Sequence, residues 1–305
     1  MTAPAHPSPR GILLVDKPGG MTSHDVVSRA RRALQTRKIG HAGTLDPMAT
    51  GLLVLGVGPA TRLLTFIVGL DKTYEATIRL GVATDSDDAD GEETERAAAD
   101  VVAGVDDRMI SDGVAALTGA IDQVPSRVSA IKVGGKRAYA LARAGEAVEL
   151  AARTVTVSRF DVREIRRNAD AAVIDVDVVV DCSSGTYIRA LARDLGASLG
   201  VGGHLTALRR TRIGPFSVAG AVTDLEPGAP LQSDADVAAA VLGAFPVSAD
   251  EARDLRHGKR LTGAADRLPT PTPAALDPEG RLVGIVERRG QDVKSIMNMA
   301  EEASA

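Results

Sequence analysis

Two long segments of alternating apolar and polar residues constrain the fold of this chain more than any other feature. They run from Thr154 to Ile165 and from Ala172 to Val180, and the polar stretch Arg166 to Asp170 separates them. A period of two is typical of strands that bury one face, and a short polar connection between two such strands predicts a hairpin. The fold must therefore contain an antiparallel sheet.

Helical periodicity occurs between the predicted strands. Thr186 to Leu199 carries its apolar residues on one helical face, and Ser23 is a suitable N-cap for a helix that begins beside it. Tyr74 to Leu80 alternates like a half-buried strand. Strands and helices mixed in this way favour an α+β fold. Because aromatic residues make up only 2% of the chain and Trp is absent, the core must consist mainly of Val, Leu, Ile and Ala.

The chain, with 305 residues, is long enough for one large core and a small accessory domain. Its composition shifts toward Pro, Gly, Ala and Asp from Asp224 onward, and Glu226 to Pro230 marks a boundary. A strand pair at Ala274–Leu276 and Leu282–Val286 makes the second domain β-rich, and the chain is expected to fray after Arg289. We predict a flexible tail at 1–9, a main domain at 10–223, a small domain at 224–293 and a frayed end at 294–305.

The sequence also excludes several classes of protein. Cys182 is the only cysteine, so no internal disulfide is predicted, and the five histidines do not form ligand spacing with it, so no metal site is predicted. The N-terminal residues contain no apolar stretch of the signal-peptide kind, and no run reaches the roughly 18 apolar residues of a membrane span. We therefore expect a soluble, cytoplasmic protein.

The distribution of charge is more informative than the formal net charge of -4. Acidic residues crowd the segment from Asp85 to Glu95, which is most simply a solvated loop. Basic residues gather in three other regions, which would give an anion-binding surface if they lay on one face. These regions hold Arg29, Arg31, Arg32, Arg37 and Lys38, then Arg127, Lys132, Lys136, Arg137 and Arg143, then Arg189, Arg193, Arg209, Arg210 and Arg212.

The segment Gly40 to Gly51 is the strongest candidate for a functional loop. It holds Asp46 between Leu45 and Pro47, with glycines on both sides. The proline stiffens the backbone beside the carboxylate, and the glycines let a ligand come close. An aspartate before a proline is, however, more often a simple turn former, so these residues alone leave both readings open.

The string GHAGTLDPMATG in this loop resembles the signature loop of the TruB family of pseudouridine synthases, whose catalytic aspartate falls at Asp46. Three further segments resemble family motifs and follow in the family order, namely Lys17 to Ser23, Lys72 to Ala76 and Ser183 to Arg189. Two more segments agree, within 124–139 and 208–216. The resemblance covers the chain from Gly11 to Phe216.

This resemblance implies both a fold and an activity. The fold would be the pseudouridine synthase α+β core, with a mixed, largely antiparallel sheet and flanking helices, followed by a small PUA-like β-rich domain. The activity would be isomerisation of the uridine at position 55 in the T-loop of tRNA to pseudouridine, with Asp46 acting on a flipped-out base. The partner would be the T-loop and T-stem of tRNA, and no cofactor, metal or obligate protein partner is expected.

The resemblance also implies roles for further residues. Tyr74 would pack against the target base and supply an acid or base, although a core aromatic is the alternative. Arg189 would pair with Asp46, although it could instead be a surface helix residue. Further contacts to substrate are expected from His41, Lys17, Lys132, Tyr187, Arg209 and Arg210; among these, Lys17 and Lys132 are expected at phosphate.

The chemistry explains why an arginine is needed beside the aspartate. Asp46 could attack C6 of uracil, attack C1′ of ribose, or remove the 2′ proton, and all three routes require an ionised carboxylate. A pocket that has shed water raises the pKa of a carboxyl group, so a cation must oppose that effect, and Arg189 is suited to do so. Two rival functions stay open at this stage: the guide-RNA-dependent branch of the family, and an RNA-binding or tRNA-folding protein without catalysis.

Overall fold

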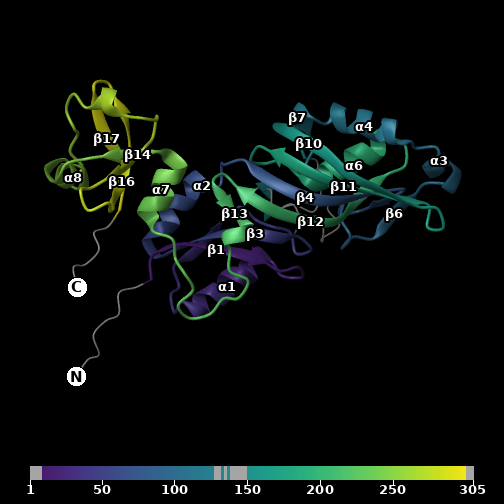
Figure 1. Cartoon of the computed structure of the whole chain (residues 1–305), viewed down its shortest axis with the longest axis horizontal. Coiled ribbons are helices and arrows are strands. Elements are labelled where there is room, and N and C mark those ends of the chain that lie inside the picture. The colour runs from purple at the N-terminus through teal and green to yellow at the C-terminus, as the bar shows by residue number, and fades with distance from the viewer. Residues whose placement is uncertain (1–8, 127–131, 134–135, 138–149, 300–305) are drawn as a thin grey trace.

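The computed structural model describes residues 9–126, 132–133, 136–137 and 150–299. A nine-stranded sheet forms the larger part of the molecule, and a four-stranded sheet lies at one end of it (Figure 1). Two further strand pairs are small, β5 (Val82–Thr84) with β6 (Glu93–Arg96) and β8 (Lys132–Val133) with β9 (Lys136–Arg137).

The large sheet is mixed and largely antiparallel, as expected. Its main path has the order β1-β3-β12-β4-β11-β10-β7, with β2 beside β3 and β13 beside β12. The strands are β1 (Gly11–Lys17), β2 (Ile39–Ala42), β3 (Thr50–Val57), β4 (Lys72–Leu80), β7 (Gly119–Gln123), β10 (Arg153–Asn168), β11 (Val173–Cys182), β12 (Gly203–Ile213) and β13 (Phe216–Ser217). The predicted hairpin is β10 with β11, and it is longer than the alternation indicated because β10 continues to Asn168 toward the turn and β11 continues to Cys182 at its far end.

Strand β12 joins two halves of this sheet. It pairs in parallel with β3 through Arg210 and Gly51, and antiparallel with β4 on its other side. The parallel contact is close, because a Cβ atom on Gly51 would lie 2.2 Å from the Arg210 carbonyl oxygen. Gly51 also has a φ of 101°, which a residue with a side chain rarely adopts. The backbone there therefore requires glycine.

Helices cover one face of the strands from β12 to β7. This layer contains α6 (Ile188–Ser198) and α4 (Asp107–Ala116) (Figure 1). The other helical segments of the described residues are α1 (Ser23–Ala33), η1 (Gly58–Leu63), α2 (Leu64–Ile67), α3 (Ala99–Ala103), η2 (Val218–Gly220), α7 (Asp234–Leu242), α8 (Ala249–Arg256) and η3 (Ala265–Arg267).

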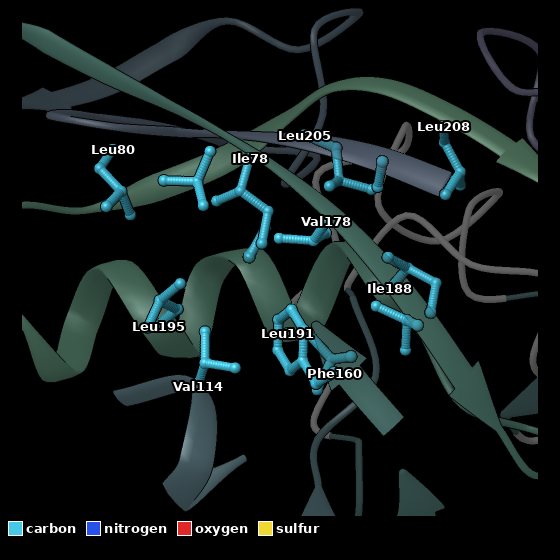
Figure 2. Packing of buried hydrophobic residues seen from close by; sticks show 14 of the residues in the cluster. Ile78, Leu80, Val114, Phe160, Val178, Ile188, Leu191, Leu195, Leu205 and Leu208 are labelled. Atoms are coloured by element: carbon cyan, nitrogen blue, oxygen red, sulfur yellow. The ribbon is translucent and has the colours of Figure 1, made fainter. Parts of the chain in front are cut away.

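The core beneath α6 is mainly aliphatic, as the composition requires. Figure 2 shows Leu191 and Leu195 of α6 facing Ile78 of β4 and Leu205 of β12, all with no exposed surface. The alternate side chains of β4 and β11 form polar pairs on the opposite face, such as Thr77 with Asp177. Because Tyr74 lies in phase with Ile78, it points toward the α6 side of the sheet.

The four-stranded sheet is formed by β14 (Ala244–Pro246), β15 (Ala274–Leu276), β16 (Leu282–Arg289) and β17 (Asp292–Asn298). The predicted strand pair is present as β15 and β16. The expectation that the chain frays after Arg289 is wrong for residues 292–298, which pair with β16. Val293 and Met297 are buried there between more exposed neighbours, a short alternation that the sequence analysis missed.

Helix α7 packs between the two sheets. It contacts α2, η1 and β1 on one side and β14, β15 and β16 on the other. Its residues share a buried apolar cluster with both, which includes Ile12, Leu52, Val237 and Ile285. Within the part of the chain that the structure describes, no helix is long and apolar enough to cross a membrane, and no three potential metal ligands lie together.

Candidate active site

The loop that carries Asp46 connects β2 to β3, and Ser23 holds it from one side. The Ser23 hydroxyl accepts a hydrogen bond from the Leu45 amide (2.8 Å) and donates one to the Leu45 carbonyl (3.1 Å). The expectation that Ser23 caps α1 is therefore wrong. Thr22 is the N-cap, since its side chain accepts from the Asp25 amide and the Asp25 carboxylate accepts in return. The hydroxyl of Ser23 is free to hold the loop because its neighbour performs the capping.

Lys17 holds the same loop from the other side. Its side chain has no exposed surface, and its ammonium donates to the carbonyls of Pro18 (2.9 Å), Met21 (2.7 Å) and Pro47 (3.2 Å). Desolvation lowers the pKa of this amine to about 8, although the nearby Asp46 opposes the shift. This placement does not support the expected contact with phosphate. Lys17 instead fixes the backbone immediately after Asp46.

The adjacent residues Thr22 and Ser23 allow a matched test of this arrangement. Ser23→Ala leaves buried backbone groups of Leu45 without their partner, which costs about 1–3 kcal/mol, and it should also lower turnover because Asp46 loses its support. Thr22→Ala should cost about 1 kcal/mol through the lost cap, with turnover near the native rate. Thermal unfolding and single-turnover assays measure the two effects. Equal losses of turnover in both variants would contradict the assigned division of roles.

Arg189, in the first turn of α6, contacts the Asp46 carboxylate at two points. Its Nη2 donates to Oδ1 (3.2 Å), and its Nε lies 3.0 Å from Oδ2. The Arg189 side chain is only 3% exposed, whereas that of Asp46 is 33% exposed. The arginine is thus buried behind the carboxylate, which keeps an open side toward solvent. Arg189 is not the surface residue of the alternative reading.

A second carboxylate, Asp88, lies behind Arg189. Its Oδ2 is 3.2 Å from Arg189 Nη1, which also donates to the Ser86 carbonyl (2.8 Å). Asp87 beside it forms an ion pair with Arg193, at 3.3 Å, one turn further along α6. The expectation of a solvated loop for the acidic run is therefore wrong here, since both aspartates are buried. Burial is possible because two arginines of α6 neutralise them.

Opposing effects act on the pKa of Asp46. Desolvation raises it above the ordinary value, the Arg189 guanidinium lowers it, and the Asp88 carboxylate raises it. Asp88 therefore holds Arg189 in place, but its negative charge also raises the pKa of Asp46. The net raised pKa of Asp46 makes the carboxylate more basic than one in water, which suits a nucleophile or base.

A pocket of about 290 Å³ opens beside Asp46, on the α6 side of the sheet. Its volume lies at the small end of the roughly 300–1,000 Å³ of ligand pockets. The wall is partly apolar, with Leu208 and Ile188 beside the ring of Tyr74, while Lys72 and Arg210 add two cations. The remaining lining residues are Gly43, Thr44, Leu45, Val68, Ser184, Gly185, Thr186, Tyr187 and Arg189.

The Tyr74 side chain is buried in the wall of this pocket, at 7% exposure. Desolvation raises the pKa of its hydroxyl, and the Arg210 guanidinium beside it lowers that pKa. Two backbone carbonyls hold the Arg210 side chain. Its Nε donates to the Leu52 carbonyl (2.8 Å) and its Nη2 donates to the Gly43 carbonyl (3.1 Å). Tyr74 thus offers both a ring and a hydroxyl next to Asp46.

The other expected contact residues fall in different places. Tyr187 lines the pocket, and its backbone amide and carbonyl both bond to the side chain of Gln123 (2.8 and 3.0 Å). Arg209 lies on the opposite face of β12 from Arg210 and pairs with Asp16 at 2.6 Å. His41 is on β2 opposite Leu55 and does not line the pocket.

Lys132 belongs to β8, but its side chain lies outside the described residues. Lys72 is a pocket residue that belongs to one of the sequence motifs, but the motif alone did not indicate a role for it. Its signal was its spacing, since a lysine two residues before Tyr74 on one strand shares the pocket face. The sequence did not indicate a role for Asp88, because it lies in a run of acidic residues that is typical of a solvated loop.

A carboxylate held by a buried arginine in a small, partly apolar pocket has the character of an enzyme active site. Residues 31–188 match the N-terminal domain of the TruB family of pseudouridylate synthases. Residues 189–227 match the C-terminal domain of tRNA pseudouridylate synthase B, and residues 243–300 match the C-terminal domain of tRNA pseudouridine synthase II.

Curated relatives agree over nearly the whole chain. The tRNA pseudouridine synthase B of Leifsonia xyli is 56% identical over 97% of this chain and 98% of that protein. The protein of the same name from Nocardia farcinica is 57% identical over 92% of this chain and 90% of that protein. A chain from an H/ACA RNP bound to a substrate RNA containing 2′-deoxyuridine has the same fold, with a TM-score of 0.69 and 23% identity over 96% of this chain and 86% of that one.

The fold and the site together define a pseudouridine synthase, an enzyme of the isomerase class. The chain belongs to the TruB family. The resemblance found in the motifs is therefore confirmed.

Proposed function

We propose that this enzyme isomerises the uridine at position 55 in the T-loop of tRNA to pseudouridine, and that Asp46 is the essential carboxylate. The two-point contact of Arg189 with Asp46 at the mouth of the pocket is the observation that carries the proposal. The names of the relatives support tRNA as the substrate. Such a substrate fits an enzyme that works in the cytoplasm without an obligate protein partner.

The reaction needs only groups that this pocket offers. The bond between N1 of uracil and C1′ of ribose breaks, the uracil rotates, and C5 bonds to C1′. The proton on C5 is then lost while N1 gains one, so that no cofactor or external redox partner is needed. Asp46 acts in its ionised form, which Arg189 favours, and its open side faces the pocket. Lys17 and Ser23 are positioning residues, because they fix the loop on which Asp46 lies.

The pocket fits one base that has left the RNA stack. Leaving the stack costs roughly a few kcal/mol, which contacts in the pocket must offset. The ring of Tyr74 supplies a stacking face, and Leu208 and Ile188 supply apolar walls. Single bases in loops are accessible to such pockets, since sequence-specific RNA recognition works best on unstacked nucleotides.

Two substitutions of Tyr74 separate stacking from proton transfer. If the hydroxyl transfers the proton, Tyr74→Phe should slow single-turnover isomerisation by roughly a hundredfold or more, with tRNA affinity little changed. If the ring of Tyr74 only stacks on the base, Tyr74→Phe should lower the single-turnover rate only slightly. Tyr74→Leu should be severe in both cases, because the base loses a contact worth roughly 1–3 kcal/mol and its alignment with Asp46. Native rates in both folded variants would make Tyr74 a core residue only.

The proposed activity is tested with purified protein and one unmodified tRNA that carries tritium at C5 of its uridines. Release of tritium by the protein alone, with pseudouridine mapped to position 55, is the expected result. A tRNA with cytidine at position 55 is the matched control and should release none. Release from the control at the same rate would contradict the assigned position.

The same assay decides between the two rivals. The guide-RNA-dependent branch of the family requires a guide RNA and partner proteins, so protein alone would be inactive and only the guide together with the partners would restore turnover. An RNA-binding or tRNA-folding protein would bind the tRNA but release no tritium under either condition.

A further inference from the structure

Lys72 is a buried cation in the wall of the pocket, and the reaction described above gives it no role. It is the first residue of β4, two before Tyr74, so both side chains face the pocket. Its exposed fraction is 6%. Cys182 of β11 and Ile213 of β12 are its partners across the sheet.

The Lys72 ammonium uses only part of its hydrogen-bonding capacity among the described residues. It donates to the carbonyls of Val68 (3.0 Å) and Leu70, while an ammonium has three protons to donate. It forms no ion pair with any residue in the described ranges of the chain. The adjacent cation, Arg210, also donates only to uncharged groups among those residues. Two cations therefore line the pocket, and neither forms an ion pair with a carboxylate of the described residues.

Burying two cations without ion pairs is costly, and further negative charge in the pocket offsets part of that cost. An ionised group loses several kcal/mol of hydration when it is buried, and an unpaired one recovers little of it. Desolvation accordingly lowers the pKa of Lys72 to about 8; Arg210 lowers it further, while Cys182 and Asp71 oppose the shift. Lys17, whose pKa is equally lowered, differs because carbonyls accept all its protons and it does not line the pocket.

The isomerisation proposed above creates an anion at this place. When the N1–C1′ bond breaks, its electron pair stays on the uracil, whose negative charge spreads from N1 to the carbonyl oxygens. The bond from C5 to C1′ consumes this charge when it forms, and the later loss of the C5 proton is balanced by the proton that N1 gains. This holds for attack at C1′ and for the glycal route, and a preceding attack at C6 also leaves electron density on the base.

We propose that the Lys72 ammonium stabilises the negative charge that the uracil carries while it is detached from the ribose. This role rests on the proposed function, since it requires that uracil be cleaved in this pocket. Donors aimed at a developing charge accelerate a reaction because they favour the transition state over the bound substrate. Lys72 therefore acts on the chemical step and hardly on tRNA binding.

A competing role is purely structural, in which Lys72 ties the turn before β4 through the carbonyls of Val68 and Leu70. The two roles differ in how they depend on charge. The test compares Lys72→Met, which loses the charge, with Lys72→Arg, which keeps it. Single-turnover rates and tRNA affinities are measured for both and for the native enzyme.

Lys72→Met is expected to slow the chemical step by about 10²- to 10³-fold, as the loss of one charge-stabilising donor does, with tRNA affinity little changed. Lys72→Arg is expected to recover at least about tenfold of that loss, because a guanidinium supplies the same charge. A folded Met variant within about threefold of the native rate would overturn the proposal. If the Met variant does not fold, Lys72→Gln replaces it in every comparison.

The pH dependence gives the decisive readout. The ratio of native to Met-variant rates is expected to be largest below pH 8, where Lys72 is charged, and to fall toward unity as pH rises through its pKa of about 8. The titratable or charged groups nearby are present in both proteins, namely Lys17, Asp46, Tyr74, Asp71, Cys182, Arg189 and Arg210. Lys72 lowers the pKa of Cys182, but burial keeps that pKa at about 11, above the range of the test. A ratio independent of pH would assign a structural role and overturn the proposal.

Failure of this inference is distinct from failure of the proposed function. If the native enzyme makes pseudouridine in tRNA and the Met variant keeps its rate, only the role of Lys72 is lost. If the native enzyme alone makes no pseudouridine in tRNA, the proposed function fails first and the role of Lys72 fails with it.

Discussion

Replacing Asp46 with Asn is expected to lower turnover below about one percent of the native rate. The amide keeps the shape of the side chain and one oxygen for Arg189 Nη2, but it is neither nucleophilic nor basic. The affinity for tRNA should change little, because the pocket wall stays intact. Tritium release measures turnover, and a filter-binding titration measures affinity.

Asp177→Asn is the matched control for this variant. Asp177 lies on the opposite face of the sheet, bonded to Thr77 and paired with Arg166, so the same substitution leaves the pocket untouched. Exposed pairs of this kind contribute about 0–1 kcal/mol, and its turnover should be native. Substantial turnover by the Asp46→Asn variant would remove Asp46 from the chemistry, whichever route the reaction takes.

Arg189→Lys is expected to have the second largest effect, a loss of at least about a hundredfold in turnover. The guanidinium contacts both oxygens of Asp46 while its Nη1 contacts Asp88 and the Ser86 carbonyl. An ammonium keeps the charge but cannot hold three groups in one plane. Asp46 would then be misaligned with the base. Single-turnover kinetics at saturating protein isolate this chemical effect.

Arg193→Lys is the control for the arginine substitution. Arg193 lies one turn along the same helix and pairs with Asp87 and Asp194, outside the pocket. Its replacement should cost stability rather than catalysis. If both lysine variants lost turnover equally, packing of α6 and not the contact with Asp46 would explain the result.

The sequence predicted the class of the fold because its long strands alternate cleanly. The hairpin of β10 and β11 and the helix α6 are single uninterrupted patterns, and the structure contains them nearly as expected. β17 was missed because its alternation is short and includes a lysine and a serine. Thr22 and Ser23 are both good capping residues, and only the position of Leu45 in three dimensions separates their roles.

The placement of charges could not be predicted so well. Asp46 and Arg189 were expected to meet because a desolvated carboxylate needs a cation. Asp87 and Asp88 belong to a run whose other members are mostly exposed, and their burial depends on the arginines of a helix about 100 residues later. Lys17 was expected at phosphate and Arg210 at the substrate, yet backbone carbonyls accept from both. Local patterns do not reveal such long-range contacts.

The position of β12 in the interior of the sheet affects how this protein folds while it is synthesised on the ribosome. Asp46 belongs to the half of the sheet with β3, whereas Tyr74 and Arg189 belong to the half with β4, and β12 joins them through residues 203–213. Each half therefore presents a bare strand edge until β12, late in the chain, has emerged. Such edges are prone to pair with other chains, and non-local pairing of this kind is slow. The interval before β12 inserts is the time at which a nascent copy is most exposed to aggregation and most dependent on chaperones.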